Sequence, residues 1–296
     1  MTPRDEALVV TLELFSGETY TVRVQLCANV ADVKRAVLAQ LQSHAVTVRL
    51  LLHGHVLEDT KLAADISDTS WQLVVARTRT EAASFAQLAE RHELYREMLE
   101  HMRAISRLDG EMSNDELRLF STASKRHVSA LRTAVLHFSP SAGEELAAAQ
   151  AELLQQCRSV IEVSERQLPL STTIERRVWH LKHVADHYRY IVSHSSGGMK
   201  DSAALKAQTF YDDASQKAIA HLSPSHPLRA AVFLNLAIFT YDILSDRAKA
   251  ISIAENALGL ASSVPACDVQ GIYAGIESTV QALRDNIQDW MAPDDP

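Results

Sequence analysis

The sequence has little glycine, proline or cysteine for its length. Nine Gly and eight Pro among 296 residues argue against long loops and low-complexity tracts. The three cysteines, Cys27, Cys157 and Cys267, are far apart and odd in number, so they fit neither a disulfide framework nor a paired-cysteine metal site. We therefore expect a chain that folds in a reducing compartment, the cytoplasm or the nucleus.

Long apolar runs and an excess of positive charge are also missing. No uncharged segment is long enough to span a membrane, and MTPRDEALVV at the N-terminus lacks the charged-then-apolar layout of a signal peptide. The net charge of -8 disfavours a general nucleic-acid binder, although a local basic pocket is compatible with an acidic protein. We expect neither a membrane nor a nucleic acid as partner.

Catalytic and metal-binding motifs are absent as well. The sequence contains no GxGxxG, Walker A or GxSxG motif. His180, His183 and His187 have i, i+3, i+7 spacing on a predicted helix, but no HExxH pattern and no suitable neighbouring carboxylate accompanies them. The chain is therefore not expected to be an enzyme or to hold a metal or a cofactor.

The N-terminal part alternates apolar and polar side chains with period two. Alternation over residues 8–26, interrupted at Ser16–Gly17, predicts a β-hairpin. A helical segment over 30–42 follows, and residues 47–59 and 71–77 predict two further strands. This order predicts a small α+β domain with one helix on one face of a sheet, over residues 1–78.

Residues 7–77 resemble ubiquitin. The hairpin turn, the VADVKRAV helix, the segment LLLHGHVLEDTKLAADI and the last strand WQLVVAR carry the resemblance, which implies a ubiquitin-like β-grasp domain. It also implies an apolar contact face at Phe15, Leu51 and Val74; the alternative is that these residues only cover the sheet. The diglycine tail of ubiquitin is missing, since the last strand continues into ARTRTEAAS, so we expect a built-in module that is not conjugated.

From about residue 81 onward the hydrophobic period is that of a helix. Eight segments between residues 85 and 291 carry apolar residues at i, i+3, i+4 and i+7, separated by Gly and Pro breaks. Ser113 is a predicted N-cap, and Pro227 suits the first turn of its helix. The pattern predicts an all-α domain of about nine antiparallel helices over 83–293, after a short linker at 79–82.

One of these helices carries polar residues at a spacing that places them on a single face. Lys182, Asp186, Arg189 and Tyr190 lie at i, i+4, i+7 and i+8, so Asp186 can hold the stems of both cations. Such a face is most often a solvated surface with weak ion pairs.

Polar pairs seven residues apart recur on two other helices. They are Lys125 with Arg132, and Asn235 with Asp242. A single Asn in an apolar helix is most often a satisfied core amide. Taken together, however, the cations and amides on several helices predict one concave anion site, because Arg and Lys suit a phosphate and Asn suits the backbone of an extended peptide.

Residues 82–292 resemble the 14-3-3 family of phosphoserine- and phosphothreonine-peptide adaptors. The segments HYRY, HPLR with LNLAIFTYDIL, and ALRDNIQDW carry the resemblance. By position it implies a phosphate cradle formed by Lys125, Arg132, Arg189 and Tyr190. It implies a peptide groove formed by Lys182, Leu234, Asn235, Ile238, Asp242, Asp285, Asn286 and Trp290.

The chain departs from the family at one wall of this groove. Ser278, Ala282 and Asp289 stand where the family has bulky aliphatic side chains. Each loss removes roughly 1.5–3 kcal/mol of apolar burial, so we expect a shifted sequence preference or a lower affinity.

The resemblance also implies a dimer through the first helix, which this chain modifies. Leu88, Tyr95 and Glu97 fit that helix, but His92 and Leu94 do not, and the junction at 136–150 is shorter than in the family. We expect dimerisation to be weakened, rearranged or absent.

The expected function is that of a phosphopeptide-binding adaptor with a built-in ubiquitin-like module, linking phosphorylated clients to receptors of the ubiquitin–proteasome pathway. The alternative is a helical scaffold or regulatory protein with a degenerate groove, whose binding does not depend on phosphate.

Overall fold

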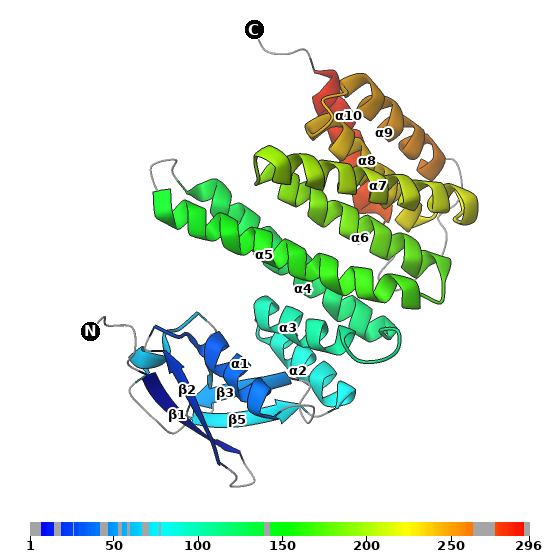
Figure 1. Ribbon diagram of the computed structural model, residues 1–296. Coiled ribbons are helices and arrows are strands. Elements are labelled where there is room, and N and C mark those ends of the chain that lie inside the picture. The colour runs from blue at the N-terminus through cyan, green and yellow to red at the C-terminus, as the bar shows by residue number, and fades with distance from the viewer. Residues whose placement is uncertain are drawn as a thin grey trace. The chain divides into compact units, whose positions relative to one another are not determined.

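A computed structural model describes most of the chain (Figure 1). The described residues are 7–14, 19–25, 27–41, 47–52, 55–57, 60–66, 71–76, 78–138, 143–262 and 276–292. The chain divides into two compact units, Met1–Leu108 and Asp109–Pro296.

The first unit contains a five-stranded mixed sheet of order β2-β1-β5-β3-β4. The strands are β1 (Ala7–Leu14), β2 (Thr19–Gln25), β3 (Thr47–Leu52), β4 (His55–Val56) and β5 (Trp71–Ala76). The predicted hairpin is confirmed, since β1 pairs antiparallel with β2, and β1 runs parallel to β5. The single strand predicted over 47–59 is wrong, because the chain reverses there and pairs Leu51 with Val56.

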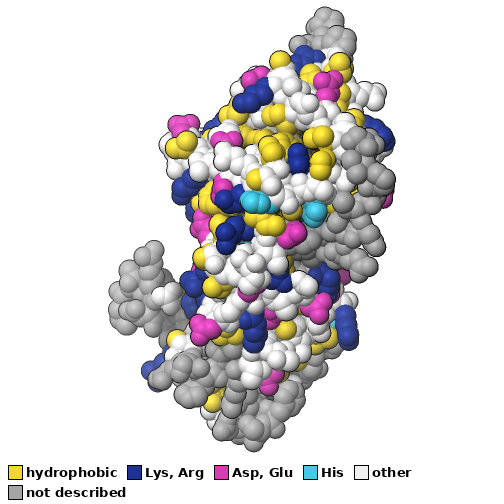
Figure 2. Space-filling model, turned by 90° about the vertical axis from the view of Figure 1, so that its right-hand side faces the viewer, with side chains coloured by type: hydrophobic (Ala, Val, Ile, Leu, Met, Phe, Trp, Pro, Cys, Tyr) yellow, Lys and Arg dark blue, Asp and Glu magenta, His cyan; other side chains and the backbone are white. Residues whose placement is uncertain are grey.

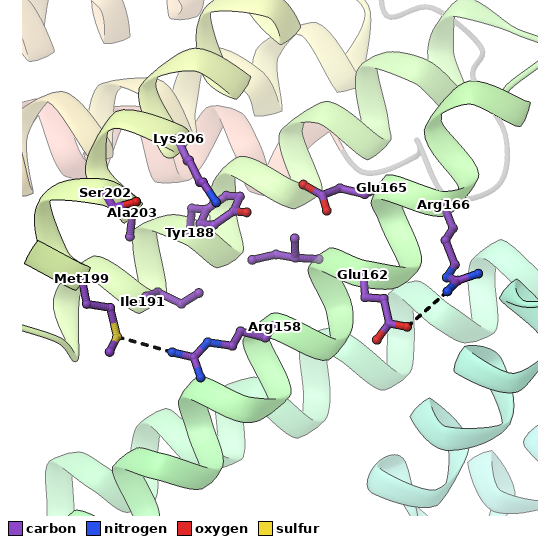
Figure 3. Close-up of a pocket in the computed structure, with 11 residues that line it drawn as sticks. Arg158, Glu162, Glu165, Arg166, Tyr188, Ile191, Met199, Ser202, Ala203 and Lys206 are labelled. Atoms are coloured by element: carbon purple, nitrogen blue, oxygen red, sulfur yellow. Dashed lines mark hydrogen bonds and ion pairs between the residues drawn. The ribbon is translucent and has the colours of Figure 1, made fainter.

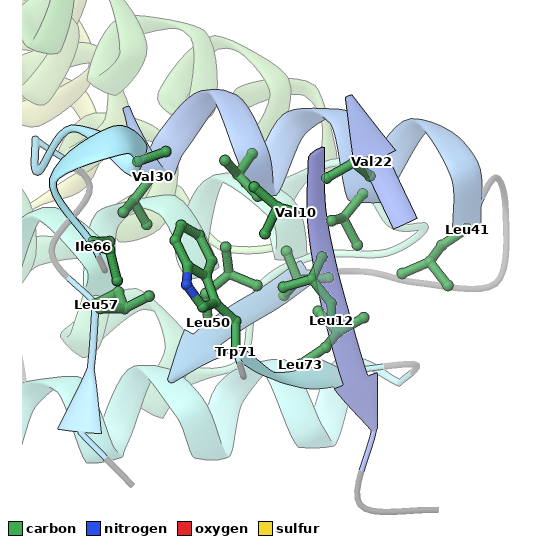
Figure 4. Close-up of a cluster of buried hydrophobic side chains, with 14 residues drawn as sticks. Val10, Leu12, Val22, Val30, Leu41, Leu50, Leu57, Ile66, Trp71 and Leu73 are labelled. Carbon is green, nitrogen blue, oxygen red and sulfur yellow. The ribbon is translucent and has the colours of Figure 1, made fainter. Parts of the chain in front are cut away.

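One helix, α1 (Val30–Leu41), covers one face of this sheet, as predicted, and a 3-10 helix, η2 (Ala63–Asp65), precedes β5. Period-two alternation points Val10 and Leu12 of β1 inward, where they meet Val33 and Val37 of the helix. Trp71 and Leu73 of β5 complete the core and are at most 2% exposed. Figure 4 shows these side chains gathered between α1 and the strands, which explains the apolar residues at every second strand position.

The first unit also contains α2 (Arg79–Arg91) and α3 (Tyr95–Ser106). The first of the eight helical segments predicted above covers residues 85–105 as one helix. This prediction is wrong, because Glu93 has a left-handed backbone with φ of 56° that ends α2 before α3 begins. Residues 79–82, assigned above to a linker, form the first turn of α2. Thr78 caps that turn in a capping box with Glu81.

A buried ion pair joins β3 to α3. Nε of Arg49, which is 4% exposed, donates to Oε1 of Glu97, which is 8% exposed. On the same helix, Nδ1 of His101 lies 3.1 Å from Oγ1 of Thr47, and the Arg49 guanidinium lies 5.4 Å from the ring centroid of Phe85 on α2. The sheet is therefore covered by α1 on one face and contacted by α2 and α3 on the other.

This second face carries two of the three residues that the ubiquitin resemblance assigns to partner contact. Val74 lies opposite Arg49 in the strand register, and both Leu51 and Val74 are half-buried. Phe15 and the turn at Ser16–Gly17 lie outside the described residues.

The second unit is entirely helical in its described part. Its helices are α4 (Asn114–His137), α5 (Gly143–Gln167), α6 (Ile174–Ser193), α7 (Gly197–His221), α8 (Pro227–Asp242), α9 (Arg247–Ser262) and α10 (Ile276–Met291), with a 3-10 helix, η3 (Leu168–Leu170), after α5. With α2 and α3 this makes nine α-helices after residue 78 in the described chain, as predicted. The predicted starts are confirmed: Ser113 forms a capping box with Glu116, and Pro227 begins α8.

Consecutive helices of the second unit pack side by side, α4 on α5, α5 on α6 and α6 on α7, while α8, α9 and α10 form a further group (Figure 1). Within the residues described, no helix is long and apolar enough to cross a membrane.

We predict that the ion pair of β3 and α3 makes the first unit sensitive to acid. Burial alone would raise the pKa of Glu97, but the contacts of His101 and Arg49 and the positive charges of Arg49 and Lys34 lower it from 4.5 to about 2. The ionised carboxylate therefore stabilises the fold fully above pH 4.5, by about 3 kcal/mol, and this contribution is lost as the pH falls towards 2.

The measurement is urea unfolding at pH 7, 4.5 and 3, followed by circular dichroism. Glu97→Gln should lower the free energy of unfolding at pH 7 and flatten its dependence below pH 4.5. Glu100→Gln, on an exposed part of α3, is the control. An unchanged pH dependence in Glu97→Gln would contradict the assignment.

Candidate functional site

A buried carboxylate, Asp186 on α6, organises polar side chains from three helices. Nζ of Lys182 on α6, the hydroxyl of Tyr211 on α7 and Nδ2 of Asn235 on α8 each donate to it at 2.7 Å. Burial would raise the pKa of Asp186, but the charges of Lys182 and Arg189 and the hydrogen bonds from Lys182 and Tyr211 outweigh burial and lower it. The carboxylate is therefore ionised at neutral pH, and it ties α6, α7 and α8 together.

Two arginines from different helices meet at the ring of Tyr190. The guanidinium of Arg132 on α4 lies 4.3 Å from the ring centroid, and that of Arg189 on α6 lies 4.8 Å from it. Nε of Arg189 also donates to the hydroxyl of Tyr211 at 3.3 Å. Burial would lower the pKa of Arg189, but Tyr211, Tyr190 and Asp186 raise it above its ordinary value, so this arginine keeps its charge.

The positive charge of the arginines also affects the pKa values of Asp242 and His194. Burial raises the pKa of Asp242, at the end of α8, while Arg189 and Arg132 oppose this rise. Burial lowers the pKa of His194, and Arg132 lowers it further. Both arginines therefore act on Asp242, whereas only Arg132 acts on His194.

Other predicted site residues lie apart from this centre. Lys125 is exposed on α4, two turns before Arg132, and it lines a cavity of about 480 Å³ along that helix. Asp285 on α10 is exposed and accepts a hydrogen bond from Gln281, and Asn286 is half-buried.

The remaining groove residues belong to helix packing. Trp290 is 7% exposed, and its ring stacks on Tyr241 at 4.8 Å between centroids. Leu234 and Ile238 are half-buried against the same cluster of α8, α9 and α10. Tryptophan at this position therefore fixes α10 against α8.

Sequence reasoning missed Tyr211 as a member of the site. Tyr211 is fully buried and bonds both Asp186 and Arg189, yet it lies 25 residues after Asp186 on another helix. No local spacing signals such a contact. Asp186, by contrast, was identified from its spacing to Lys182 and Arg189, and its contact with Lys182 is confirmed.

The three histidines of α6 serve helix packing. Oγ of Ser124 on α4 lies 3.1 Å from Nε2 of His183, and Oγ of Ser164 on α5 lies 3.0 Å from its Nδ1. The His183 ring also stacks on Trp179, at 4.4 Å between centroids. Among the residues described, no group of three His, Cys, Asp or Glu is placed to hold a metal ion.

A second cavity, of about 610 Å³, lies on the other side of α6 (Figure 3). Tyr188 and Ile191 form its α6 wall, while α5 contributes Arg158, whose Nη2 contacts Sδ of Met199 on α7. None of the residues predicted from the sequence lines this cavity. The side of α6 that carries Asp186, Arg189 and Tyr190 is therefore distinct from it.

The fold and this site define a protein whose helical unit gathers two guanidinium groups and a tyrosine at a helix face held by one buried acid. Residues 85–291 match the family described as 14-3-3 protein. The chain is 30% identical over 228 residues to 14-3-3 protein beta/alpha-A of Xenopus laevis, covering 72% of this chain and 93% of that protein.

Two fungal proteins are similar to the same extent. Protein BMH2 of Saccharomyces cerevisiae is 30% identical over 235 residues, covering 74% of this chain and 86% of its own. Checkpoint signal transducer rad24 of Schizosaccharomyces pombe is 30% identical over 231 residues, covering 73% and 86%. The chain belongs to the 14-3-3 family, and the match begins inside α2, so β1 to β5 lie outside it.

We predict that the buried histidines make the helical unit sensitive to mild acid. Burial, followed by neighbouring positive charge, lowers the pKa of His180 to about 3 and that of His183 well below 6.5. Burial also lowers the pKa of His187, to about 4, against the opposing effects of His183 and Asp186. The unfolded chain therefore binds more protons than the folded chain below pH 6.5, and the difference approaches three protons near pH 5.

The free energy of unfolding should then rise with pH between roughly pH 4 and 6, most steeply near pH 5, by about 4 kcal/mol per unit. Unfolding in guanidinium chloride at half-unit pH steps measures this slope. His187→Gln should reduce it by about a third, whereas His221→Gln, on the exposed end of α7, should leave it unchanged. A slope that His187→Gln does not change would refute the assignment.

Proposed function

We propose that the helical part of the chain is an adaptor, not an enzyme, that binds phosphoserine and phosphothreonine peptides. The observation that supports this most directly is the convergence of Arg132 and Arg189 at the ring of Tyr190. Two guanidinium groups can donate several hydrogen bonds to a phosphate, and a tyrosine hydroxyl adds another donor. Lys125, two turns away on α4, adds positive charge on the same helix face as Arg132.

The distribution of negative charge around this cradle supports the same proposal. Asp186 accepts hydrogen bonds directly from Lys182 and Asn235. Arg189 is linked to Asp186 only through the hydroxyl of Tyr211. The arginine pair is thus held in place without a direct carboxylate partner at hydrogen-bond distance in the described residues. An incoming phosphate would fill that role.

The proposed peptide groove runs from this cradle along α8 and α10. Nδ2 of Asn235 is bound to Asp186, which leaves its carbonyl oxygen to accept from a peptide N–H. Asn286 and Asp285 would act similarly from α10, and Leu234 and Ile238 would form the apolar floor. Trp290 would support this wall from behind, because its ring is buried against Tyr241.

We predict that Arg132 is required for phosphate-dependent binding. Arg132→Gln should weaken binding of a phosphoserine peptide by about ten- to a hundredfold, because a charge-assisted contact is lost, and should not change binding of the unphosphorylated peptide. Arg132 is preferred to Arg189 because it is half-buried and stands outside the Asp186 hydrogen-bond network. Fluorescence anisotropy with both peptides measures the effect.

Arg158→Gln on α5 is the matched control, since Arg158 lines the cavity on the other side of α6. Equal binding of the two peptides, or none, would favour the alternative of a scaffold that does not depend on phosphate.

We also propose that the first unit is a ubiquitin-like module and that the chain is a monomer. Strand order β2-β1-β5-β3-β4 with a helix after the first hairpin supports a β-grasp fold. Leu51 and Val74 would offer the contact face to receptors of the ubiquitin pathway, bounded by Arg49. Glu97, which fits the helix through which the family pairs, is bound to Arg49 within the chain, and this supports a monomer.

Sedimentation velocity tests both ideas. We expect one species of 32.7 kDa at micromolar concentration, and a faster species when a ubiquitin-binding receptor domain is added. Leu51→Ala with Val74→Ala should abolish the shift, and Arg35→Ala on the exposed side of α1 should keep it. A dimer at nanomolar concentration would refute the monomer, and no shift with any receptor domain would count against the module.

A further inference from the structure

The α4 stripe is a row of six polar side chains, of which the proposed phosphate cradle uses only Lys125. Its members lie at i, i+3, i+4, i+7, i+8 and i+11 and line the cavity of about 480 Å³ along α4: Arg118, Ser121, Thr122, Lys125, Arg126 and Ser129. This spacing places all six on one helix face over three turns. The stripe shares Lys125 with the cradle and leads away from Arg132 towards the start of the helix.

The side chains of the α4 stripe are all either basic or hydroxyl-bearing. Three of its members are cations, three are hydroxyls, and no acid or apolar residue lines the same cavity in the described structure. The chain as a whole has a net charge of -8, and Figure 2 shows Lys and Arg interspersed with Asp and Glu on the face that it presents. Lys125 and Arg126 are exposed, and no described carboxylate forms an ion pair with either of them. The exposed charges of Lys125 and Arg126 therefore favour a negatively charged ligand.

The side of the proposed groove formed by α10 has few apolar side chains that could select apolar residues of a peptide. Ser278 and Asp289 on α10 are exposed, and Ala282 is half-buried and small. A peptide bound between these elements would therefore gain more from charge on the α4 side than from apolar burial on α10.

We propose that the α4 stripe binds further anionic groups of the phosphopeptide, either carboxylates or a second phosphate. This rests on the proposed phosphopeptide function and narrows its ligands to peptides rich in acid beside the phosphorylated residue. Arg126 and Arg118 precede Arg132 by six and fourteen residues, or about 9 and 21 Å along the helix. An extended peptide rises about 3.3 Å per residue, so the acids would lie about three and six residues from the phosphorylated residue.

The test compares a phosphoserine peptide in a neutral background with two acidic versions. One carries Asp at the third and sixth residues after the phosphoserine, and the other carries Asp at the third and sixth residues before it. We expect one of the two acidic phosphopeptides to bind about tenfold more tightly than the neutral one, measured by fluorescence anisotropy. Arg118→Gln with Arg126→Gln should reduce this ratio to below about twofold.

The matched control is Arg158→Gln with Lys200→Gln, which removes two exposed charges from α5 and α7 and should keep the ratio. Thermal melting by circular dichroism verifies that each variant is folded. Equal affinity of wild-type chain for all three phosphopeptides, or an equal loss of the ratio in both double variants, would overturn the proposal.

The unphosphorylated acidic peptides separate the two hypotheses. If they bind as tightly as their phosphorylated forms, the proposed phosphopeptide function fails and the inference fails with it. If phosphorylation strengthens binding but acidic residues add nothing, only the inference about the α4 stripe fails.

Discussion

The buried carboxylate of Asp186 is the interaction on which the site depends. It accepts hydrogen bonds at 2.7 Å from three side chains on α6, α7 and α8, so it fixes the relative positions of those helices where they meet. A carboxylate in such a poorly solvated place is stable only when cations and donors surround it. Removing it would leave Lys182 and Arg189 to repel one another and would leave Tyr211 without its acceptor. The arrangement of the cations in the site therefore depends on the buried negative charge of Asp186.

The cations of the site differ in whether they bind Asp186 directly. Asp186 accepts hydrogen bonds from Lys182, Tyr211 and Asn235, and only the hydroxyl of Tyr211 connects it to Arg189. The guanidinium groups of Arg189 and Arg132 are held against the ring of Tyr190, a contact that positions them without neutralising their charge. The site therefore differs in charge from the larger cavity beyond α6. In that cavity the carboxylates of Glu162 and Glu165 lie among three cations and offset their positive charge.

The parts of the molecule that could be predicted from sequence are those governed by local periodicity. Spacing at i, i+4 and i+7 was enough to place Lys182, Asp186 and Arg189 on one face, and alternation was enough to place β1, β2 and α1. Contacts between distant elements were not accessible in this way. Tyr211 joins the site because α7 packs on α6, and the burial of Trp290 follows from the packing of α10 on α8. The break between α2 and α3 was missed for a different reason, since the left-handed backbone at Glu93 leaves the hydrophobic period intact on both sides.

The boundary of family similarity and the boundary of the compact unit do not coincide, and the Arg49–Glu97 pair gives the physical reason. The family match begins at residue 85, whereas the first unit extends to Leu108 and includes α2 and α3 with the sheet. Arg49 and Glu97 are both nearly inaccessible to solvent, so separating them would leave two uncompensated buried charges. A partner subunit could use Glu97 only by replacing Arg49, and a receptor that reached Val74 would meet a surface already bounded by this pair. The sheet thus supplies the cation that the buried acid of α3 requires, and this explains why α3 belongs to the same compact unit as the sheet.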